Sequence, residues 1–310
     1  MGSVHRYRET ERRLFADAGA SPTEHRITLP TLGVGARVLE VGSGHPVLFL
    51  HGGPMAAGTW AYLAARTVGL RCLLLDRPGC GLSDPPPFVP TPDRLRTYVE
   101  QLTVDVLDAL DLEQSSLVAS SFGGYSALCS AASHPDRVDR VVLAGCPAFV
   151  PGWSEPSLFA LLRAPIVRSL VLGAPVTAGS VRFFLKQAGH ARSLAAGRIP
   201  EVMLAWIRAW QRDTDTMRHD AAMIRACGAS IRHFDPALDL GEDDLQAVRA
   251  PCLLLAGTDD PVGGVAVMEQ LARLLPVATV DAWEAAGHLP WLDDADRAAG
   301  AVTRFLLDRS

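Results

Sequence analysis

Two adjacent serines stand between an apolar run and two glycines in the stretch V-A-S-S-F-G-G, residues 118–124. A serine at a sharp strand-to-helix turn holds its hydroxyl above a sheet, where it can act as a nucleophile. The turn is tight, so the residues two before and two after the serine must be small. Ser120 fails this test because both of its neighbours at that spacing are large, whereas Ser121 passes with Ala119 and Gly123. The spacing predicts that Ser121 is the nucleophile.

A serine nucleophile supports acyl transfer, but it does not act alone. The neutral hydroxyl needs a base to take its proton, and the base needs a carboxylate to orient it. N–H donors must also face the oxyanion that develops during the reaction. These parts come from other segments of the chain, so the fold has to bring them to Ser121.

Short apolar runs alternate with helical segments along most of the chain. The runs lie at 47–50, 70–75, 115–119, 138–144, 252–256 and 277–281, and the helical segments at about 56–67, 93–110, 123–133, 265–274 and 294–308. Strands that are buried on both faces are apolar throughout, as in a parallel sheet. The alternation predicts an α/β fold with a doubly wound, mostly parallel sheet. A charged helix at 5–18 and an antiparallel pair of strands around Gly33 and Gly35 are expected before it.

The alternation is lost between Gly145 and Pro251, where helix-like stretches are separated by proline and glycine. A loop of that length without structure is improbable in a compact domain. We therefore expect a core of residues 1–147 and 246–310 and a helical cap at 148–245. The cap's aromatic residues are expected to form mostly a small core of the cap itself, with little effect on the stability of the main core, and to place a few rings over Ser121. They are Trp153, Phe159, Phe183, Phe184, Trp206 and Trp210.

The stretch A-S-S-F-G-G resembles the nucleophile elbow of the α/β-hydrolase family, with Ala119 where the family's G-x-S-x-G motif has glycine. L-H-G-G-P (50–54) resembles the family's oxyanion-hole loop, and D-R-P-G-C-G-L-S-D (76–84) resembles its loop after the next strand. The resemblance implies that the N–H groups of Gly53 and Phe122 form the oxyanion hole. It also implies that His51 is structural.

The family places its triad in the chain order serine, acid, histidine, which selects the two remaining residues. A-G-T-D-D-P-V (256–262) resembles the family's G-x-x-D turn, and the spacing from the glycine selects Asp260 over Asp259. E-A-A-G-H-L-P (284–290) resembles its terminal G-H motif, which makes His288 the base. The resemblance covers nearly the whole chain apart from the N-terminal extension and the insertion.

Composition excludes several classes of partner. A net charge of −5 argues against nucleic acid, and the charged N-terminus has no apolar segment of the kind found in signal peptides. Six cysteines without a C-x-x-C pair fit a reducing, cytoplasmic location. We expect a small-molecule substrate and no membrane or nucleic-acid partner; the oligomeric state is left open. Neither H-E-x-x-H nor G-x-G-x-x-G after a strand occurs, so no metal and no cofactor are expected.

The expected activity is hydrolysis of a carboxylic ester, lactone or thioester of a small to medium, mainly apolar substrate through an acyl-enzyme. Family members that use an aspartate nucleophile, the haloalkane dehalogenases and epoxide hydrolases, do not fit Ser121. Hydrolases of carbon–carbon bonds in ring-fission products share the triad and the cap and stay an alternative. So do proline iminopeptidases, although their elbow usually reads Gly-Gly-Ser-Trp-Gly. A ligand-binding protein on the same fold would show no turnover.

Overall fold

The sheet predicted from the apolar runs is present. The computed structural model describes residues 2–88, 91–230 and 233–308; residues 1, 89–90, 231–232 and 309–310, which fall within the predicted core and cap ranges, lie outside the described residues. Eight strands form one sheet in the order β1-β2-β4-β3-β5-β6-β7-β8. Their bounds are β1 Thr23–Leu29, β2 Val34–Gly42, β3 His45–Leu50, β4 Leu70–Asp76, β5 Ser115–Ala119, β6 Val138–Ala144, β7 Cys252–Gly257 and β8 Ala278–Trp283.

The pairing directions follow the prediction. β1 pairs with β2, and β2 with β4, in antiparallel register, whereas β4, β3, β5, β6, β7 and β8 are parallel neighbours. The carboxyl ends of the parallel strands therefore meet at one edge. β3 lies between β4 and β5, so the strand order reverses there, and loops at such a reversal form the usual binding crevice of open α/β sheets.

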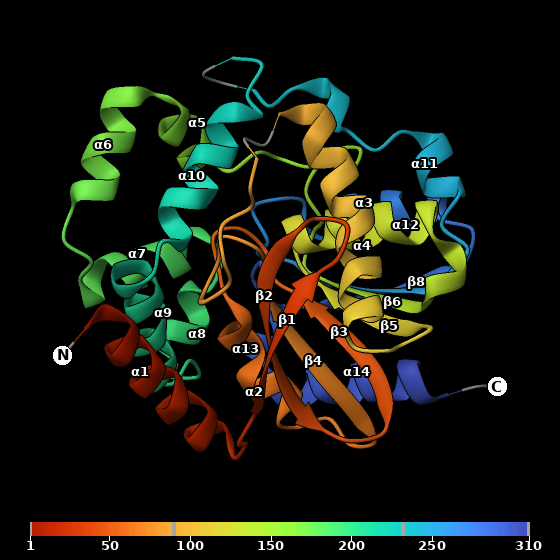
Figure 1. The fold of residues 1–310 in the computed structure, drawn as a ribbon, viewed down its shortest axis with the longest axis horizontal. Coiled ribbons are helices and arrows are strands. Elements are labelled where there is room, and N and C mark those ends of the chain that lie inside the picture. The colour runs from red at the N-terminus through yellow and green to blue at the C-terminus, as the bar shows by residue number, and fades with distance from the viewer. Residues whose placement is uncertain (1, 89–90, 231–232, 309–310) are drawn as a thin grey trace.

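Helices cover both faces of the sheet (Figure 1). In sequence order they are α1 Ser3–Ala18, the 3₁₀ turn η1 Ala57–Trp60, α2 Ala61–Ala64, α3 Pro92–Ala109, α4 Phe122–Ser133, η2 Pro135–Arg137, α5 Ser157–Arg163, α6 Pro165–Gly173, α7 Ala178–Gln187, α8 Ala191–Ala195, α9 Glu201–Asp213, α10 Thr216–Ala226, η3 Pro236–Leu238, α11 Glu242–Gln246, α12 Gly264–Leu274, α13 Pro290–Asp293 and α14 Ala295–Leu307.

Each buried strand supplies both layers of the core because successive side chains point to opposite faces. On β3, Val47 and Phe49 pack with residues of α2 and α14, while Leu48 and Leu50 pack with residues of α3, α4 and α12. This two-sided burial explains why the strand is apolar at four consecutive positions.

The helices α5–α10 lie between β6 and β7 along the chain and gather on one side of the molecule, beside α1 (Figure 1). The expectation that their aromatic residues form a separate small core is wrong for α9. Trp206 and Trp210 belong to the same buried cluster as Trp60 and Trp291 of the main core. The indole of Trp206 lies against Gly58, where an added methyl group would come within 2.7 Å of the ring.

The boundaries 148 and 245 stay a prediction. Leu238, Leu240 and Leu245 fall inside that range, yet they pack in the sheet-face cluster with α3 and α4.

All six cysteines are free and buried, and the sequence contains no C-x-x-C pair. In the ranges that the structure describes, we find no helix with the length and apolar character needed to cross a membrane.

Candidate active site

Ser121 occupies the turn between β5 and α4, and its backbone is strained as the motif predicts. Its φ is 53° and its ψ is −121°, a conformation that a residue with a Cβ rarely adopts. Small neighbours permit the turn: a methyl group on Gly123 would come within 2.0 Å of the Leu50 carbonyl oxygen. Ser121 is partly exposed and lines a pocket, whereas Ser120 is fully buried.

The loop after β3 lies directly against Ser121. A methyl group on Gly52 would come within 2.9 Å of the Ser121 Cβ, so glycine allows the two segments to meet. Gly53 and Phe122 line the same pocket as Ser121. Phe122 is the first residue of α4, where a helix leaves N–H groups without an intrahelical partner. Both predicted oxyanion donors therefore belong to segments that border the serine.

His51, in the same loop, has both ring nitrogens engaged. Nδ1 lies 2.7 Å from the Gly52 carbonyl oxygen, and Nε2 accepts from the Arg77 N–H at 3.2 Å. Burial, followed by the charge of Arg77, holds the pKa of His51 well below its usual value. The ring is neutral and anchors the loop.

Asp260 and His288 meet at the carboxyl edge of the sheet. His288 Nδ1 lies 2.9 Å from Asp260 Oδ1 and 3.0 Å from Oδ2. The carboxylate also accepts from the N–H groups of Cys146 at 3.0 Å and Val262 at 2.9 Å. Burial alone would raise the pKa of Asp260, but His288 and these donors lower it below its usual value. Asp259 points elsewhere, toward Arg192 at 3.6 Å.

The loop that follows β6 connects the three predicted triad residues, a role that the sequence did not reveal. Ala148 donates its N–H to the Ser121 carbonyl at 3.1 Å, and Cys146 donates to Asp260. Gly145, at φ +79°, lies so close to His288 that an added methyl group would come within 2.0 Å of its carbonyl oxygen. The residues 145–148 thus fix the spacing between the serine and the acid–base pair.

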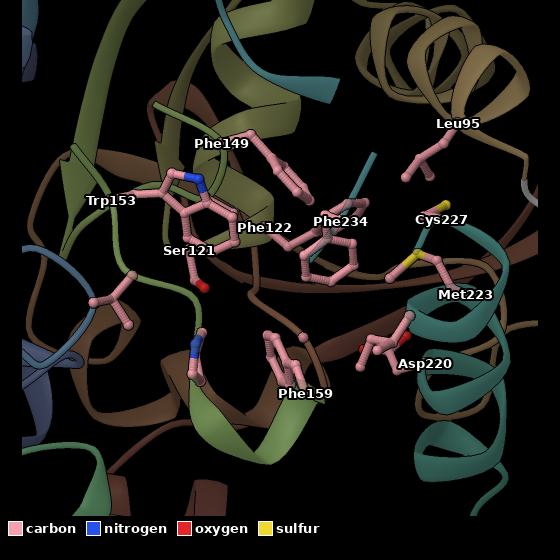
Figure 2. Close-up of a pocket in the computed structure, with 15 residues that line it drawn as sticks. Leu95, Ser121, Phe122, Phe149, Trp153, Phe159, Asp220, Met223, Cys227 and Phe234 are labelled. Atoms are coloured by element: carbon pink, nitrogen blue, oxygen red, sulfur yellow. The ribbon is translucent and has the colours of Figure 1, made fainter. Parts of the chain in front are cut away.

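The pocket beside Ser121 is lined mostly by apolar residues. In Figure 2 the Ser121 hydroxyl points into the space between Trp153, Phe159 and Phe234. Of the cap's aromatic residues, Trp153 and Phe159 line the pocket, while Phe183 is exposed and Trp206 and Trp210 are buried away from it. The lining residues are Gly53, Leu95, Ser121, Phe122, Ala148, Phe149, Trp153, Pro156, Phe159, Asp220, Met223, Ile224, Cys227, Phe234 and Val262.

Asp220 on α10 is the one charged residue among those described lining residues, and it lies across the pocket from Ser121 (Figure 2). Arg77 donates from Nη2 to Asp220 Oδ2 at 3.2 Å and to the Gly52 carbonyl at 3.1 Å. The Arg77 guanidinium also lies 4.8 Å from the centre of the Phe122 ring. The guanidinium is buried and its Nη2 is used by Asp220 and Gly52, although its Nε has no hydrogen-bond partner among the described residues. The charged residue that borders the pocket is therefore the acid Asp220.

Several of the lining residues could not be recognised as functional from the sequence. Phe149, Met223 and Phe234 look like ordinary core residues in sequence, and they reach the pocket because the insertion folds back over the sheet edge. Asp220 lies on a helix of mixed polarity, where an acid is normally solvated. Across the described residues, no group of three or more His, Cys, Asp or Glu side chains is placed to hold a metal ion.

Comparison with known proteins agrees with this geometry. The model of the alpha/beta hydrolase family matches residues 47–301. The chain is 31% identical to a 2-hydroxy-6-oxononadienedioate/2-hydroxy-6-oxononatrienedioate hydrolase of Burkholderia vietnamiensis over 281 residues, which cover 86% of this chain and 89% of that protein. It is 25% identical to a cis-3-alkyl-4-alkyloxetan-2-one decarboxylase of Shewanella oneidensis over 278 residues, 87% of this chain and 84% of that protein.

Among solved structures, a carboxylesterase of Bacillus subtilis superposes with a TM-score of 0.69 at 18% identity and covers 98% of each chain. At that identity the likeness establishes the fold alone.

Proposed function

The chain belongs to the alpha/beta hydrolase family, and from that premise we propose that it is a serine hydrolase of uncharged carboxylic esters or lactones. The observation that carries the proposal is the pairing of a strained serine with an apolar pocket whose one charged residue, among the lining residues that the structure describes, is acidic. Ser121 has φ 53°, and Asp220 stands across the pocket from it. An apolar pocket favours an apolar acyl group, and a buried carboxylate disfavours an anionic one.

The proposed reaction has two stages. His288 Nε2 takes the Ser121 proton as Oγ attacks the acyl carbon, and the N–H groups of Gly53 and Phe122 stabilise the oxyanion. His288 then gives the proton to the leaving alkoxide, and an acyl-enzyme forms. In the second stage His288 takes a proton from water as the water oxygen attacks the acyl carbon. The bond between the acyl carbon and Ser121 Oγ then breaks, His288 returns the proton to Oγ, and the carboxylic acid is released. Asp260 holds the imidazole through Nδ1, which leaves Nε2 for the serine, and stabilises the imidazolium.

Hydrolysis of a carbon–carbon bond is the second candidate, supported by the relative that is 31% identical. The name of that relative describes substrates that are dicarboxylates. A substrate of that kind needs a cation for its carboxylate, and here Arg77 already donates to Asp220 and to Gly52. The pairing supports the neutral ester over the anionic ring-fission product. The oxetanone in the name of the other relative, a decarboxylase, is an uncharged lactone with alkyl groups, and an apolar lining suits a molecule of that kind.

A substrate panel tests the proposal on the purified protein. It contains p-nitrophenyl esters of increasing acyl length, alkyl-substituted lactones, a ring-fission dienoate and a proline anilide. We expect turnover of the neutral esters or lactones, with a preference set by chain length. Turnover confined to the dienoate or to the proline anilide would show that the substrate class is wrong while leaving the serine chemistry intact.

Asp220→Asn tests the part of the proposal that concerns charge. The substitution leaves the buried Arg77 without its carboxylate, so the pocket should accept an anionic acyl group more readily. We expect the kcat/KM ratio of a p-nitrophenyl hemisuccinate to a neutral p-nitrophenyl butyrate to rise by at least about tenfold, on the order of 1.4 kcal/mol. Asp215→Asn is the matched control, because Asp215 is an exposed acid at the start of the same helix. An unchanged ratio in Asp220→Asn would contradict the proposed role of this charge.

A further inference from the structure

The segment between α7 and α8 lies against the loops that carry His288 and Asp260. The His288 N–H donates to the Ala188 carbonyl at 2.8 Å. Gly189, at φ +90°, lies so close to the acid loop that an added methyl group would come within 2.2 Å of the Asp259 carbonyl oxygen. The segment therefore contacts the loops that carry the predicted acid and base, and neither Ala188 nor Gly189 is among the described residues that line the pocket.

A buried histidine–aspartate pair continues this contact. His190 Nδ1 lies 3.0 Å from both carboxylate oxygens of Asp293, and the Ser193 hydroxyl donates to the same carboxylate. His190 is fully buried and Asp293 nearly so. Arg198 donates in turn to the Ser193 hydroxyl at 2.9 and 3.2 Å.

The pair holds the two peptide groups that flank His288. Asp293 Oδ2 accepts from the Gly287 N–H at 2.8 Å, and His190 Nε2 accepts from the Leu289 N–H at 3.2 Å. The His288 N–H between them donates to the Ala188 carbonyl. Three consecutive backbone N–H groups are therefore bonded to partners outside their own loop. Gly287 is required for this packing, because an added methyl group there would come within 2.8 Å of the His190 ring.

Ser193, His190 and Asp293 have the residue types of a second triad, but their arrangement excludes that role. The serine hydroxyl is bonded to the carboxylate, whereas a nucleophile must give its proton to the histidine. Both nitrogens of His190 are occupied, and none of the three residues lines the pocket. Asp293 and His190 instead accept from the backbone N–H groups on either side of His288.

We propose that Asp293 and His190 are positioning residues for the proposed general base, so that the inserted helices set the geometry of the triad as well as covering the pocket. We call Ala188, His190, Ser193 and Asp293 the His288 clamp. The inference rests on the proposed function, because it assigns a role relative to His288. A displacement of about 1 Å at a catalytic group can cost on the order of a hundredfold in rate. The clamp acts on kcat and leaves substrate binding alone.

Asp293→Asn is the principal test, because an amide cannot accept from three donors. Each variant is assayed for kcat and KM on a neutral p-nitrophenyl ester, for the rate at which a fluorophosphonate labels Ser121, and for its melting temperature. We expect kcat and the labelling rate to fall together by about 10- to 100-fold while KM changes by less than about twofold. Asp294→Asn is the control: it removes the same charge from the neighbouring exposed residue, which caps α14.

His190 provides a rescue. His190→Gln keeps an acceptor for the Leu289 N–H, whereas His190→Ala removes it, so the glutamine variant should retain several-fold more activity. If Asp293→Asn fails to fold, Ser193→Ala carries the test, and a fall of a few-fold in both rates is expected. Two outcomes would overturn the clamp. One is an equal loss of activity in His190→Gln and His190→Ala. The other is a labelling rate per folded molecule that equals the wild-type rate in Asp293→Asn, or in Ser193→Ala if that variant replaces it.

The labelling rate separates this inference from the proposed function. If wild-type protein is labelled at Ser121 but hydrolyses no ester, the proposed substrate class is wrong, and the labelling rates still decide the clamp. If Ser121 is not labelled in the wild type, the serine mechanism fails and the clamp fails with it.

Discussion

At the scale of single residues, backbone geometry distinguishes the two adjacent serines. Ser121 has a positive φ and borders the pocket, whereas the Ser120 side chain is fully buried in the turn. The same geometry explains why the small-residue test works: the turn brings Gly123 against the Leu50 carbonyl. The backbone conformation of this turn therefore orients the hydroxyl of a nucleophile toward the pocket before substrate binds.

Replacing each serine in turn tests this assignment. Ser121→Ala should reduce kcat by on the order of 10⁶, because the nucleophile, base and acid act as a unit. Ser120→Ala removes the buried hydroxyl of the preceding residue in the same turn, and this variant should retain most of the activity. Steady-state kinetics and mass spectrometry of the fluorophosphonate adduct provide the measurement. An adduct on Ser120 would reverse the assignment.

The two neighbouring aspartates differ in the same way. Asp260 accepts from His288 and from two backbone N–H groups, whereas Asp259 is half-buried and lies 3.6 Å from Arg192. Asp260→Asn should lower kcat by about 10⁴, since an amide favours the wrong imidazole tautomer. Asp259→Asn, which makes the same chemical change one residue away, should stay within a few-fold of the wild type. Greater damage from Asp259→Asn would contradict the choice of acid.

At the scale of elements, the sequence predicted those strands and helices that are determined by the local pattern of apolar residues. Strands buried on both faces are mostly apolar throughout, so β3–β7 could be located from apolar runs. The functional loops after β3, β5, β7 and β8 were recognised from their motifs and from the resemblance of those motifs to the family. The docking of the inserted helices could not be predicted. An amphipathic helix such as α9 shows that one face is buried, but not against which partner, and the Trp206 contact with Gly58 joins residues that are far apart in the sequence.

The shared packing of α9 makes a prediction about cooperativity. Trp206→Ala removes a fully buried indole from the cluster that contains Trp60 and Trp291, and we expect it to destabilise the whole chain by about 3–5 kcal/mol. Phe183→Ala, at an inserted aromatic residue that is 64% exposed, should change stability by less than about 0.5 kcal/mol. Thermal unfolding followed by circular dichroism and tryptophan fluorescence checks both. Two separate transitions in Trp206→Ala, with the upper one unchanged, would show that the insertion is an independent unit.

At the scale of the whole molecule, α1 connects the inserted helices to the sheet. Arg6 on α1 pairs with Asp213 on α9 at 2.6 Å, and Arg8 pairs with Glu24 on β1 at 2.6 Å. Glu11 on the buried face of α1 pairs with Arg37 on β2. Arg37 also reaches Glu24 at 2.9 Å and Asp76 at 3.0 Å, so one buried guanidinium joins α1, β1, β2 and β4. This network of charged side chains joins the inserted helices to the sheet. Its contribution to the stability of the folded protein must therefore depend on pH.

Glu24 makes that dependence testable. The hydrogen bond from Arg8, together with the charge of Arg37, lowers the pKa of Glu24 to about 2 in the folded protein, whereas an unfolded glutamate titrates near about 4.3. A carboxyl group whose pKa is depressed by folding contributes stability that is complete above its unfolded pKa and is lost as the pH falls toward its folded pKa. Glu24 should therefore stabilise the protein at neutral pH and progressively less between about pH 4.5 and 2.

The test compares how the melting temperatures of the wild type and of a Glu24 variant change as the pH is lowered. Glu24→Gln should melt at a lower temperature than the wild type at pH 6, and the gap should close as the pH is lowered toward about 2.5, because the wild type loses there what the variant already lacks. Burial raises the pKa of Glu11, which acts in the opposite sense, so the difference between the two proteins is the informative quantity. Glu284→Gln, at an exposed glutamate without an ion pair in the described part of the chain, serves as the control and should track the wild type at every pH. A constant gap between Glu24→Gln and the wild type across the acid range would mean that the Glu24 carboxylate is not the group that titrates.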